Sequence, residues 1–160
     1  MSKPADLIRE YRPDDRQEIE QCLAELQDFS KLIHENMAPG AVAPRYLQHL
    51  LIRCRETNGM IFVAESEGRI AGLVCVFASV RSEAVDEEDH EYAYISDLVL
   101  LPDQRNKGVG RLLLQRAEEH AKSQGATLLR LNVLAQNEVA RGLYNRYGFA
   151  ELVVAMQKKL

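Results

Sequence analysis

Two glycines stand one residue apart where an apolar strand pattern gives way to an apolar helix pattern. Gly108 and Gly110 lie in the stretch "LLPDQRNKGVGRLLLQRAEEHA", and three basic residues surround them, Arg105, Lys107 and Arg111. The first N–H groups of a helix have no partner within the helix and carry partial positive charge. Glycines ahead of a helix let the backbone turn tightly and let an anion come close. The spacing therefore predicts a phosphate-binding turn.

The turn does not match the two commonest phosphate motifs. No Gly-Lys-Ser/Thr triplet follows a four-residue spacer, so the stretch is not a P-loop. The third glycine of a dinucleotide fingerprint would be Leu113, and the turn lies late in the chain rather than in a first βαβ unit. A glycine-bearing helix start without any ligand is the alternative for an isolated pair of glycines.

A second motif further along the chain gives the glycine turn a context. The stretch "NEVARGLYNRYGF" begins at Asn137 and fits N-x-x-A-x-x-L/I-Y-x-x-x-G-F at every named position. Residues 105–110 fit R/Q-x-x-G-x-G/A. With these two motifs the chain resembles the GCN5-related N-acetyltransferase (GNAT) superfamily, over about residues 92–160. The resemblance implies transfer of an acetyl group from acetyl-CoA to an amine, without a metal.

The resemblance also implies how acetyl-CoA is held as co-substrate. In that family the fourth strand separates from the fifth, and the pantetheine arm, which has peptide-like groups, adds to the strand edge. The turn would hold the pyrophosphate. The implied donor-binding residues are Leu98, Val99 and Leu100 in the fourth strand, Arg105, Asn106, Lys107, Gly108, Val109, Gly110 and Arg111 in the turn, and Asn137 further on.

Tyr144 corresponds to the general acid of the family. The thiolate of CoA must leave, and a phenol placed near the sulfur can protonate it. On its own, a tyrosine on an amphipathic helix would be read as a core residue; its motif position favours the catalytic role. Tyr147 is outside the motif and is expected to pack.

The general base is where the sequence departs from the family. The two positions that often carry a glutamate are Tyr94 and Asn132 here. Asp97 is the nearest acid to the donor-binding strand, and it is either the base or a structural anchor. A route through water without a single base is the alternative, with Tyr94 holding the water or with His90 and Glu91 acting at the mouth of the strand.

An acidic loop precedes the fourth strand and bears on the acceptor. Residues 82–91, "SEAVDEEDHE", carry six carboxylates. They predict either a solvated loop or a negative mouth that attracts a small cationic amine. The family resemblance implies that the acceptor enters opposite to CoA, past a wall formed by residues 29–45 and by this loop. Transfer to a protein N-terminus or lysine, and a non-catalytic acyl-CoA-binding regulatory module, are the alternative functions.

The hydrophobic pattern of the chain predicts the helices and strands that must position these residues. Their order is typical of a single α/β domain over residues 1–160 with a mixed sheet. The expected order is β-α-α-β-β-β-α-β-α-β. The expected ranges are a strand at 6–11, a helix at 12–33, a helix from 44 to about 59, a hairpin at 60–80 that turns at 67–68, a strand at 92–102, a helix at 109–124, a strand at 127–134, a helix at 136–148 and a final strand at 149–160.

Composition narrows the function classes. The 160 residues are 46% hydrophobic and 28% charged with a net charge of −4, which argues against a nucleic-acid surface. No apolar run is long enough to span a bilayer, and no signal peptide opens the chain, so a cytoplasmic location is expected. Cys22, Cys54 and Cys75 form no CxxC pair and are expected to be reduced, mostly buried thiols. A single strand after Phe149 would leave an open edge, which makes a homodimer an expectation.

Overall fold

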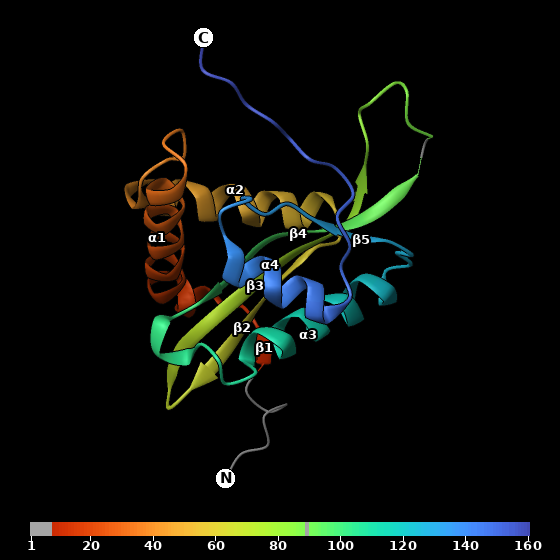
Figure 1. Cartoon of the computed structure of the whole chain (residues 1–160). Helices are drawn as coiled ribbons and strands as arrows, with labels where there is room; N and C mark the ends of the chain where they lie inside the picture. The colour runs from red at the N-terminus through yellow and green to blue at the C-terminus, as the bar shows by residue number, and fades with distance from the viewer. Residues whose placement is uncertain (1–7, 89) are drawn as a thin grey trace.

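The computed structural model describes residues 8–88 and 90–160, so part of the first predicted strand and Asp89 lie outside the described residues. A five-stranded sheet runs in the order β1-β2-β3-β4-β5 and is antiparallel except for the parallel pair β4–β5 (Figure 1). The strands are β1 (Ile8–Glu10), β2 (Met60–Ser66), β3 (Arg69–Arg81), β4 (Glu91–Leu100) and β5 (Leu129–Leu131). The α-helices are α1 (Arg16–Ile33), α2 (Ala43–Glu56), α3 (Val109–Ser123) and α4 (Glu138–Tyr147), with short 3-10 helices at Pro13–Asp15, Gly40–Val42 and Pro102–Gln104. The expected mixed α/β architecture is confirmed.

Helices cover both faces of the sheet and divide the core in two. Side chains of α1 and α2 pack with one face of β3, around Leu23, Leu47 and Cys75. Side chains of α3 and α4 pack with the other face, around Leu113 and Tyr144. Because both faces are covered, most of β3 is buried without the alternation of a half-exposed strand. None of the helices in the described part of the chain is long and apolar enough to cross a membrane.

Local sequence explains where the first helix begins. Ahead of α1, the Asp15 carboxylate accepts the Arg12 backbone N–H at 2.7 Å and two bonds from the Arg9 guanidinium at 2.8 Å. The guanidinium bond is the first cause of the lowered pKa of Asp15. This network ties β1 to the start of α1. Ile19 and Leu23 then place the apolar face of the helix on the sheet.

A tight turn joins β2 to β3, as the sequence predicts. Glu67 and Gly68 have φ values of 52° and 75°, both left-handed. Two consecutive residues of this kind give a hairpin turn whose twist matches that of the strands. The turn pairs Ser66 with Arg69, and a bulge beyond Glu65 then shifts the register so that Phe62 faces Val74.

The predicted final strand is wrong. Residues 149–160 form no helix or strand; they leave α4 as an extended segment that runs away from the sheet (Figure 1). Its alternating apolar residues are typical of a strand, but Leu152, Val154 and Met156 are 69%, 72% and 93% exposed. A strand needs a partner edge, and the neighbouring β5 has only three residues, fewer than the predicted 127–134. The strand on which the homodimer expectation rested is therefore absent from the single chain.

Candidate active site

The parallel strands β4 and β5 pair over three residues and then separate. The pairs are Ala93 with Leu129, Tyr94 with Arg130 and Ile95 with Leu131. On its other side, β4 continues to pair with β3 as far as Leu100 opposite Gly72. The edge of β4 that faces β5 is thus without a strand partner from Ser96 onward, within the described residues. An extended, peptide-like ligand has free backbone donors and acceptors there.

A bulge in β4 lies where the two strands separate. The register of β3 and β4 shifts between Cys75–Asp97 and Val76–Ile95, so Ser96 is the extra residue. The bulge turns Asp97 toward the α1–α2 face, whereas Leu98 packs on the α3–α4 face. The Ser96 hydroxyl is buried without a hydrogen bond of good geometry among the described residues. It is still close enough to the Asp97 carboxyl to lower its pKa.

The glycine turn follows β4 and has an anion-binding backbone. Asn106 and Gly108 have left-handed φ values of 60° and 81°, and Gly108 is the N-cap of α3. No side chain of the described chain caps this helix. The first N–H groups of α3 are therefore available, and alternating left-handed residues form the concave backbone that binds anions.

The two glycines of the turn are required for different structural reasons. A Cβ at Gly110 would lie 3.1 Å from Leu100 Cδ1 and 3.2 Å from Leu143 Cδ2, so the absence of a side chain brings α3 close to β4 and α4. A Cβ at Gly108 would meet no atom within 4 Å. Gly108 therefore serves the left-handed backbone and leaves open space in front of the helix.

The basic side chains of the turn are only partly free. Arg105 Nε donates to the Leu100 carbonyl at 3.3 Å, and the Arg111 guanidinium lies 5.5 Å from the ring centre of Tyr147. Lys107 is exposed. Arg105 thus already donates to a carbonyl that the family resemblance gives to the donor, and this carbonyl keeps a second lone pair for a ligand.

Tyr144 is buried on α4 beside the separated strands. Its side chain is 9% exposed, and its ring meets that of Phe149 edge-on at 5.8 Å between centres. Burial raises the pKa of Tyr144 to about 12, and the charges of Asp97 and Tyr94 add to the increase. The phenol is therefore protonated at neutral pH and is able to give up a proton to a strong base.

Asn137 begins the helix that carries Tyr144. Its Oδ1 accepts the Ala140 N–H at 3.2 Å, which satisfies one of the free donors at the start of α4. The side-chain NH₂ group has no hydrogen-bond partner within the described chain. The residue therefore has a structural role on one side of its amide and a free donor on the other.

Asp97 is held from the opposite face of the sheet by Tyr46. The Tyr46 hydroxyl lies 3.1 Å from each Asp97 carboxyl oxygen, and Asp97 is 6% exposed. Burial raises the pKa of Asp97, while Ser96, Tyr46 and the charge of His49 lower it. No sequence motif marks Tyr46, and only the packing of α2 over the sheet brings its hydroxyl to this carboxyl.

Tyr94 completes a cluster around Asp97. Its ring is stacked on Phe77 at 6.4 Å between centres, and burial raises its pKa. The Asp97 charge also raises the pKa of Tyr46 and that of Tyr144. The three sequence-predicted catalytic residues, Tyr144, Asp97 and Tyr94, are therefore within electrostatic reach of one another. The arrangement offers a proton donor on one face of β4 and a proton acceptor on the other.

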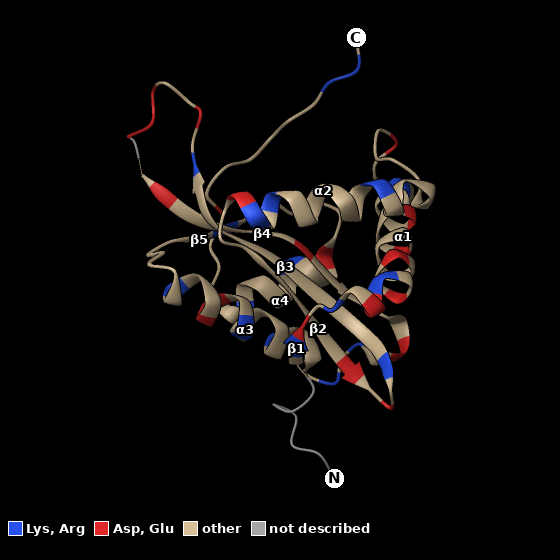
Figure 2. Cartoon of the chain, turned by 180° about the vertical axis from the view of Figure 1, so that it is seen from behind, with Lys and Arg blue, Asp and Glu red and all other residues tan. Residues whose placement is uncertain are grey.

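The acidic loop projects beyond the ends of β3 and β4 (Figure 2). Its described carboxylates at Glu83, Asp86, Glu87 and Glu88 are exposed. It joins β4 at Glu91, the end opposite to the glycine turn. Glu91 pairs with Arg81 at 2.8 Å, and the ring of His90 lies 2.9 Å from Arg130. The two residues considered for a water-mediated base therefore have protein partners.

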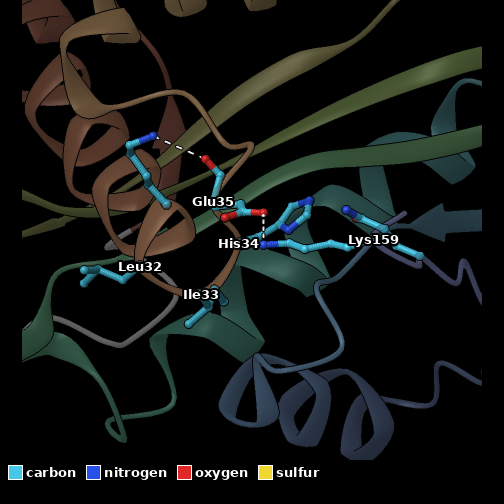
Figure 3. Close-up of a pocket in the computed structure, with 7 residues that line it drawn as sticks. Leu32, Ile33, His34, Glu35 and Lys159 are labelled. Carbon is cyan, nitrogen blue, oxygen red and sulfur yellow. Dashed lines mark hydrogen bonds and ion pairs between the residues drawn. The ribbon is translucent and has the colours of Figure 1, made fainter.

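A separate hollow of about 410 Å³ lies between the end of α1 and the C-terminal segment (Figure 3). Lys159 Nζ crosses it to Glu35 at 3.0 Å. The hollow borders part of residues 29–45, but none of the predicted donor-binding or catalytic residues lines it. Across the described residues, no group of three or more His, Cys, Asp or Glu side chains is placed to hold a metal.

Comparison with protein families gives one assignment over most of the chain. Residues 20–149 match the model of the acetyltransferase (GNAT) family. YycN of Bacillus subtilis, an uncharacterized N-acetyltransferase, is 39% identical over 48% of this chain and 49% of its own. Thialysine N-epsilon-acetyltransferase of Mus musculus is 26% identical over 91% of this chain and 84% of its own. The chain spans about half the length of the first curated relatives that it matches, between 41% and 66%.

Solved structures share the fold at low sequence identity. A tetramutant of the BH1408 protein from Bacillus halodurans superimposes with a TM-score of 0.83 at 20% identity, over 96% of this chain and 99% of that chain. The aminoglycoside N-acetyltransferase AAC(6')-Iy in complex with CoA superimposes with a TM-score of 0.68 at 15% identity, over 96% and 99%. At these identities the likeness concerns the fold alone.

Proposed function

The chain belongs to the acetyltransferase (GNAT) family, and from this premise we propose that it transfers an acetyl group from acetyl-CoA to the primary amine of a small cationic molecule, with Tyr144 as the general acid. One observation carries the proposal. The edge of β4 is unpaired from Ser96 onward, the uncapped start of α3 lies against Leu100 at that edge, and Tyr144 is buried in the same core cluster as Leu98 and Leu100.

The donor would be held mainly by backbone groups. Leu98 and Leu100 offer N–H and C=O groups along the free edge of β4 to the amides of pantetheine. The backbone groups of Val99 face β3 instead, because the Leu101 N–H donates to the Ala71 carbonyl and alternate residues of a strand face the same edge. The turn from Arg105 to Arg111 offers N–H groups to the pyrophosphate. The CoA complex of AAC(6')-Iy, a protein of the same fold, supports this choice of donor.

Acetyl-CoA supplies an activated thioester when it is bound. The chain then has two proton tasks. Asp97, with its raised pKa, would accept the proton of the incoming ammonium so that the amine is neutral. Tyr144, protonated at neutral pH, would give its proton to the departing sulfur. Asp97 lies on the α1–α2 face, where Tyr46 contacts it, and Tyr144 on α4 packs on the other face. In the proposed reaction the proton therefore leaves on one side and arrives on the other.

The acceptor class rests on charge and on the relatives. The exposed carboxylates of residues 83–88 give the end of β4 opposite to the glycine turn a negative potential that attracts cations. One relative is named for acetylation of thialysine, and a structural neighbour is named an aminoglycoside N-acetyltransferase. Both names describe transfer to a nitrogen, which supports an amine acceptor here.

A free-thiol release assay tests the proposed function. The chain is incubated with acetyl-CoA and a panel of polyamines, basic amino acids, aminoglycosides and short peptides. Release with one class establishes the enzyme and its acceptor class. No release across the panel, with acetyl-CoA binding confirmed by calorimetry, would favour a non-catalytic acyl-CoA-binding module.

The role of Tyr144 is tested with its neighbour on the same helix as a matched control. Tyr144→Phe is expected to lower kcat by about 100-fold, because the sulfur loses its proton donor. Its affinity for acetyl-CoA, measured by calorimetry, should stay unchanged. Tyr147→Phe removes a hydroxyl that donates to Glu118 at 2.6 Å and should leave kcat unchanged. An unaltered kcat in Tyr144→Phe would remove this residue as the acid.

A further inference from the structure

Two of the three cysteines meet in the core on the α1–α2 face of the sheet. Cys54 lies in the last turn of α2 and Cys75 in the middle of β3, separated by 21 positions in the sequence. Their sulfur atoms are 3.7 Å apart, and both are free thiols. Cys22, on α1, is also buried, but it has no sulfur contact among the described residues. The fold thus creates a dithiol pair and leaves a third thiol as an internal reference.

We propose that Cys54 and Cys75 form a reversible disulfide when the chain meets hydrogen peroxide. A disulfide bond is about 2.05 Å long, so the sulfurs must approach by roughly 1.7 Å. Cys54 is carried by a helix that rests on the sheet through side chains, and Cys75 is fixed by strand pairing on both sides. Rotation of the Cys54 side chain with a small shift of the helix supplies the approach.

The two thiols are suited to different steps. Cys54 lines a hollow of about 310 Å³ with Tyr11, Leu51 and Met60, and it is 8% exposed, whereas Cys75 is fully buried. The hydrogen bond from Cys75 lowers the pKa of Cys54, while burial raises that of Cys75 well above its ordinary value. The oxidant therefore reaches the thiol that more readily becomes a thiolate.

The reaction is balanced without any further reagent. The Cys54 thiolate attacks one peroxide oxygen, the O–O bond breaks, and Cys54 becomes a sulfenic acid as one water forms. The Cys75 sulfur then attacks the Cys54 sulfur, the S–O bond breaks, and a second water leaves with the Cys75 proton. Two thiols are oxidised to one disulfide, and one hydrogen peroxide is reduced to two waters.

The proposed Cys54–Cys75 disulfide would lie close to the Tyr46–Asp97 pair. Cys75 stands directly opposite Asp97 in the β3–β4 register. Cys54 lies on the same helix as Tyr46. The disulfide would therefore tie the helix that holds the Asp97 carboxyl to the strand beside that carboxyl.

Thiol counting and mass spectrometry on the full chain test the proposal. After treatment with hydrogen peroxide and removal of the excess, denatured wild-type chain should retain one of its three thiols. Its mass should fall by two hydrogen atoms, a cross-linked peptide should join Cys54 to Cys75, and dithiothreitol should restore all three thiols. Cys22→Ser should show the same loss of two thiols, whereas Cys54→Ser and Cys75→Ser should form no intramolecular disulfide.

Other results would overturn the proposal. The proposal fails if all three thiols remain under conditions that oxidise free cysteine. It also fails if the observed cross-link requires Cys22. Peptide mapping of the wild-type chain decides the question even if a serine variant does not fold. In Cys75→Ala, dimedone should label Cys54 during peroxide treatment; labelling of Cys22 alone would contradict the order of steps. None of these readouts depends on acetyl transfer, so failure here and failure of the proposed function are distinguishable.

Discussion

Asp97 is a carboxyl group that the fold holds at a cost in stability. It is 6% exposed and has a raised pKa because burial disfavours its charged form. Its hydrogen-bond partner Tyr46 is a neutral phenol, and within the described part of the chain no opposite charge at hydrogen-bond distance compensates for burial. Buried carboxyl groups with a shifted pKa are typical of functional sites, where the shifted pKa serves the reaction although it lowers the stability of the fold.

Asp97→Asn separates the catalytic role from the structural one. We expect kcat/KM to fall by about 100-fold or more and the acidic limb of its pH profile to disappear, because Asn accepts no proton. Folding raises the pKa of this carboxyl, so the unfolded chain ionises at a lower pH than the folded one. The folded protein therefore loses stability as the pH rises from the unfolded pKa to the folded pKa. The Asn variant should therefore gain free energy of unfolding relative to wild type over that pH range. A retained acidic limb would favour the water-mediated route without a single base.

Tyr46→Phe gives a directional test of the same pair. The hydrogen bond from Tyr46 lowers the pKa of Asp97, so removing it should raise that pKa. The acidic limb of kcat/KM should move to higher pH, while acetyl-CoA affinity stays unchanged. A lower rate with an unmoved limb would mean that Tyr46 only supports packing.

At the scale of elements, the glycine turn depends on backbone shape more than on side chains. Gly108 and Gly68 both have left-handed φ values, 81° and 75°, and a Cβ at either would meet no atom within 4 Å. The two positions therefore carry the same backbone strain when substituted, but only Gly108 faces the predicted donor site. This makes Gly68, in the β2–β3 turn, a matched control.

Gly108→Ala is expected to weaken acetyl-CoA binding by at least tenfold, because a methyl group enters the space in front of the α3 N–H groups. Gly68→Ala should leave the affinity unchanged. Each substitution should cost about 1 to 2 kcal/mol of stability from the left-handed backbone. Calorimetric titration with acetyl-CoA and thermal unfolding measure both quantities. Equal affinities in the two variants would contradict a pyrophosphate site at this turn.

The elements also show which parts of the molecule are predictable from sequence. Hydrophobic period and turn residues predict α1, the β2–β3 hairpin, β4 and α3 within a few residues, because local pattern and burial agree there. The segment after Phe149 has the pattern of a strand but no partner edge, and local pattern does not encode a partner. Tyr46 and the Cys54–Cys75 contact depend on how α2 crosses the sheet, which no motif in the sequence marks.

At the scale of the whole molecule, the C-terminal segment contributes little to the core. Leu152, Val153 and Val154 are 69–80% exposed, and the Lys159–Glu35 ion pair joins two exposed side chains. An exposed pair of this kind contributes about 0–1 kcal/mol. The apolar side chains of this segment are therefore available to a second molecule.

Removal of residues 152–160 tests whether the isolated chain is the working unit. If the chain is a monomer, the melting temperature should change by no more than about 4 °C, consistent with the loss of one exposed ion pair. Sedimentation should then give a monomer before and after truncation. If the segment pairs with a second copy, truncation should convert a dimer to a monomer and lower a melting temperature that depends on protein concentration.

The order of the strands has a consequence for the making of the protein. The strands follow one another across the sheet in the order in which they leave the ribosome, and hairpins join β2, β3 and β4. Neighbouring segments pair without waiting for distant ones, which shortens the search for the native sheet. The separation between β4 and β5, however, requires β5 and α4, which are synthesised after the other four strands. A nascent chain that has already built most of its sheet therefore still lacks its candidate active site, and the site is completed only once residues 129–147 have emerged.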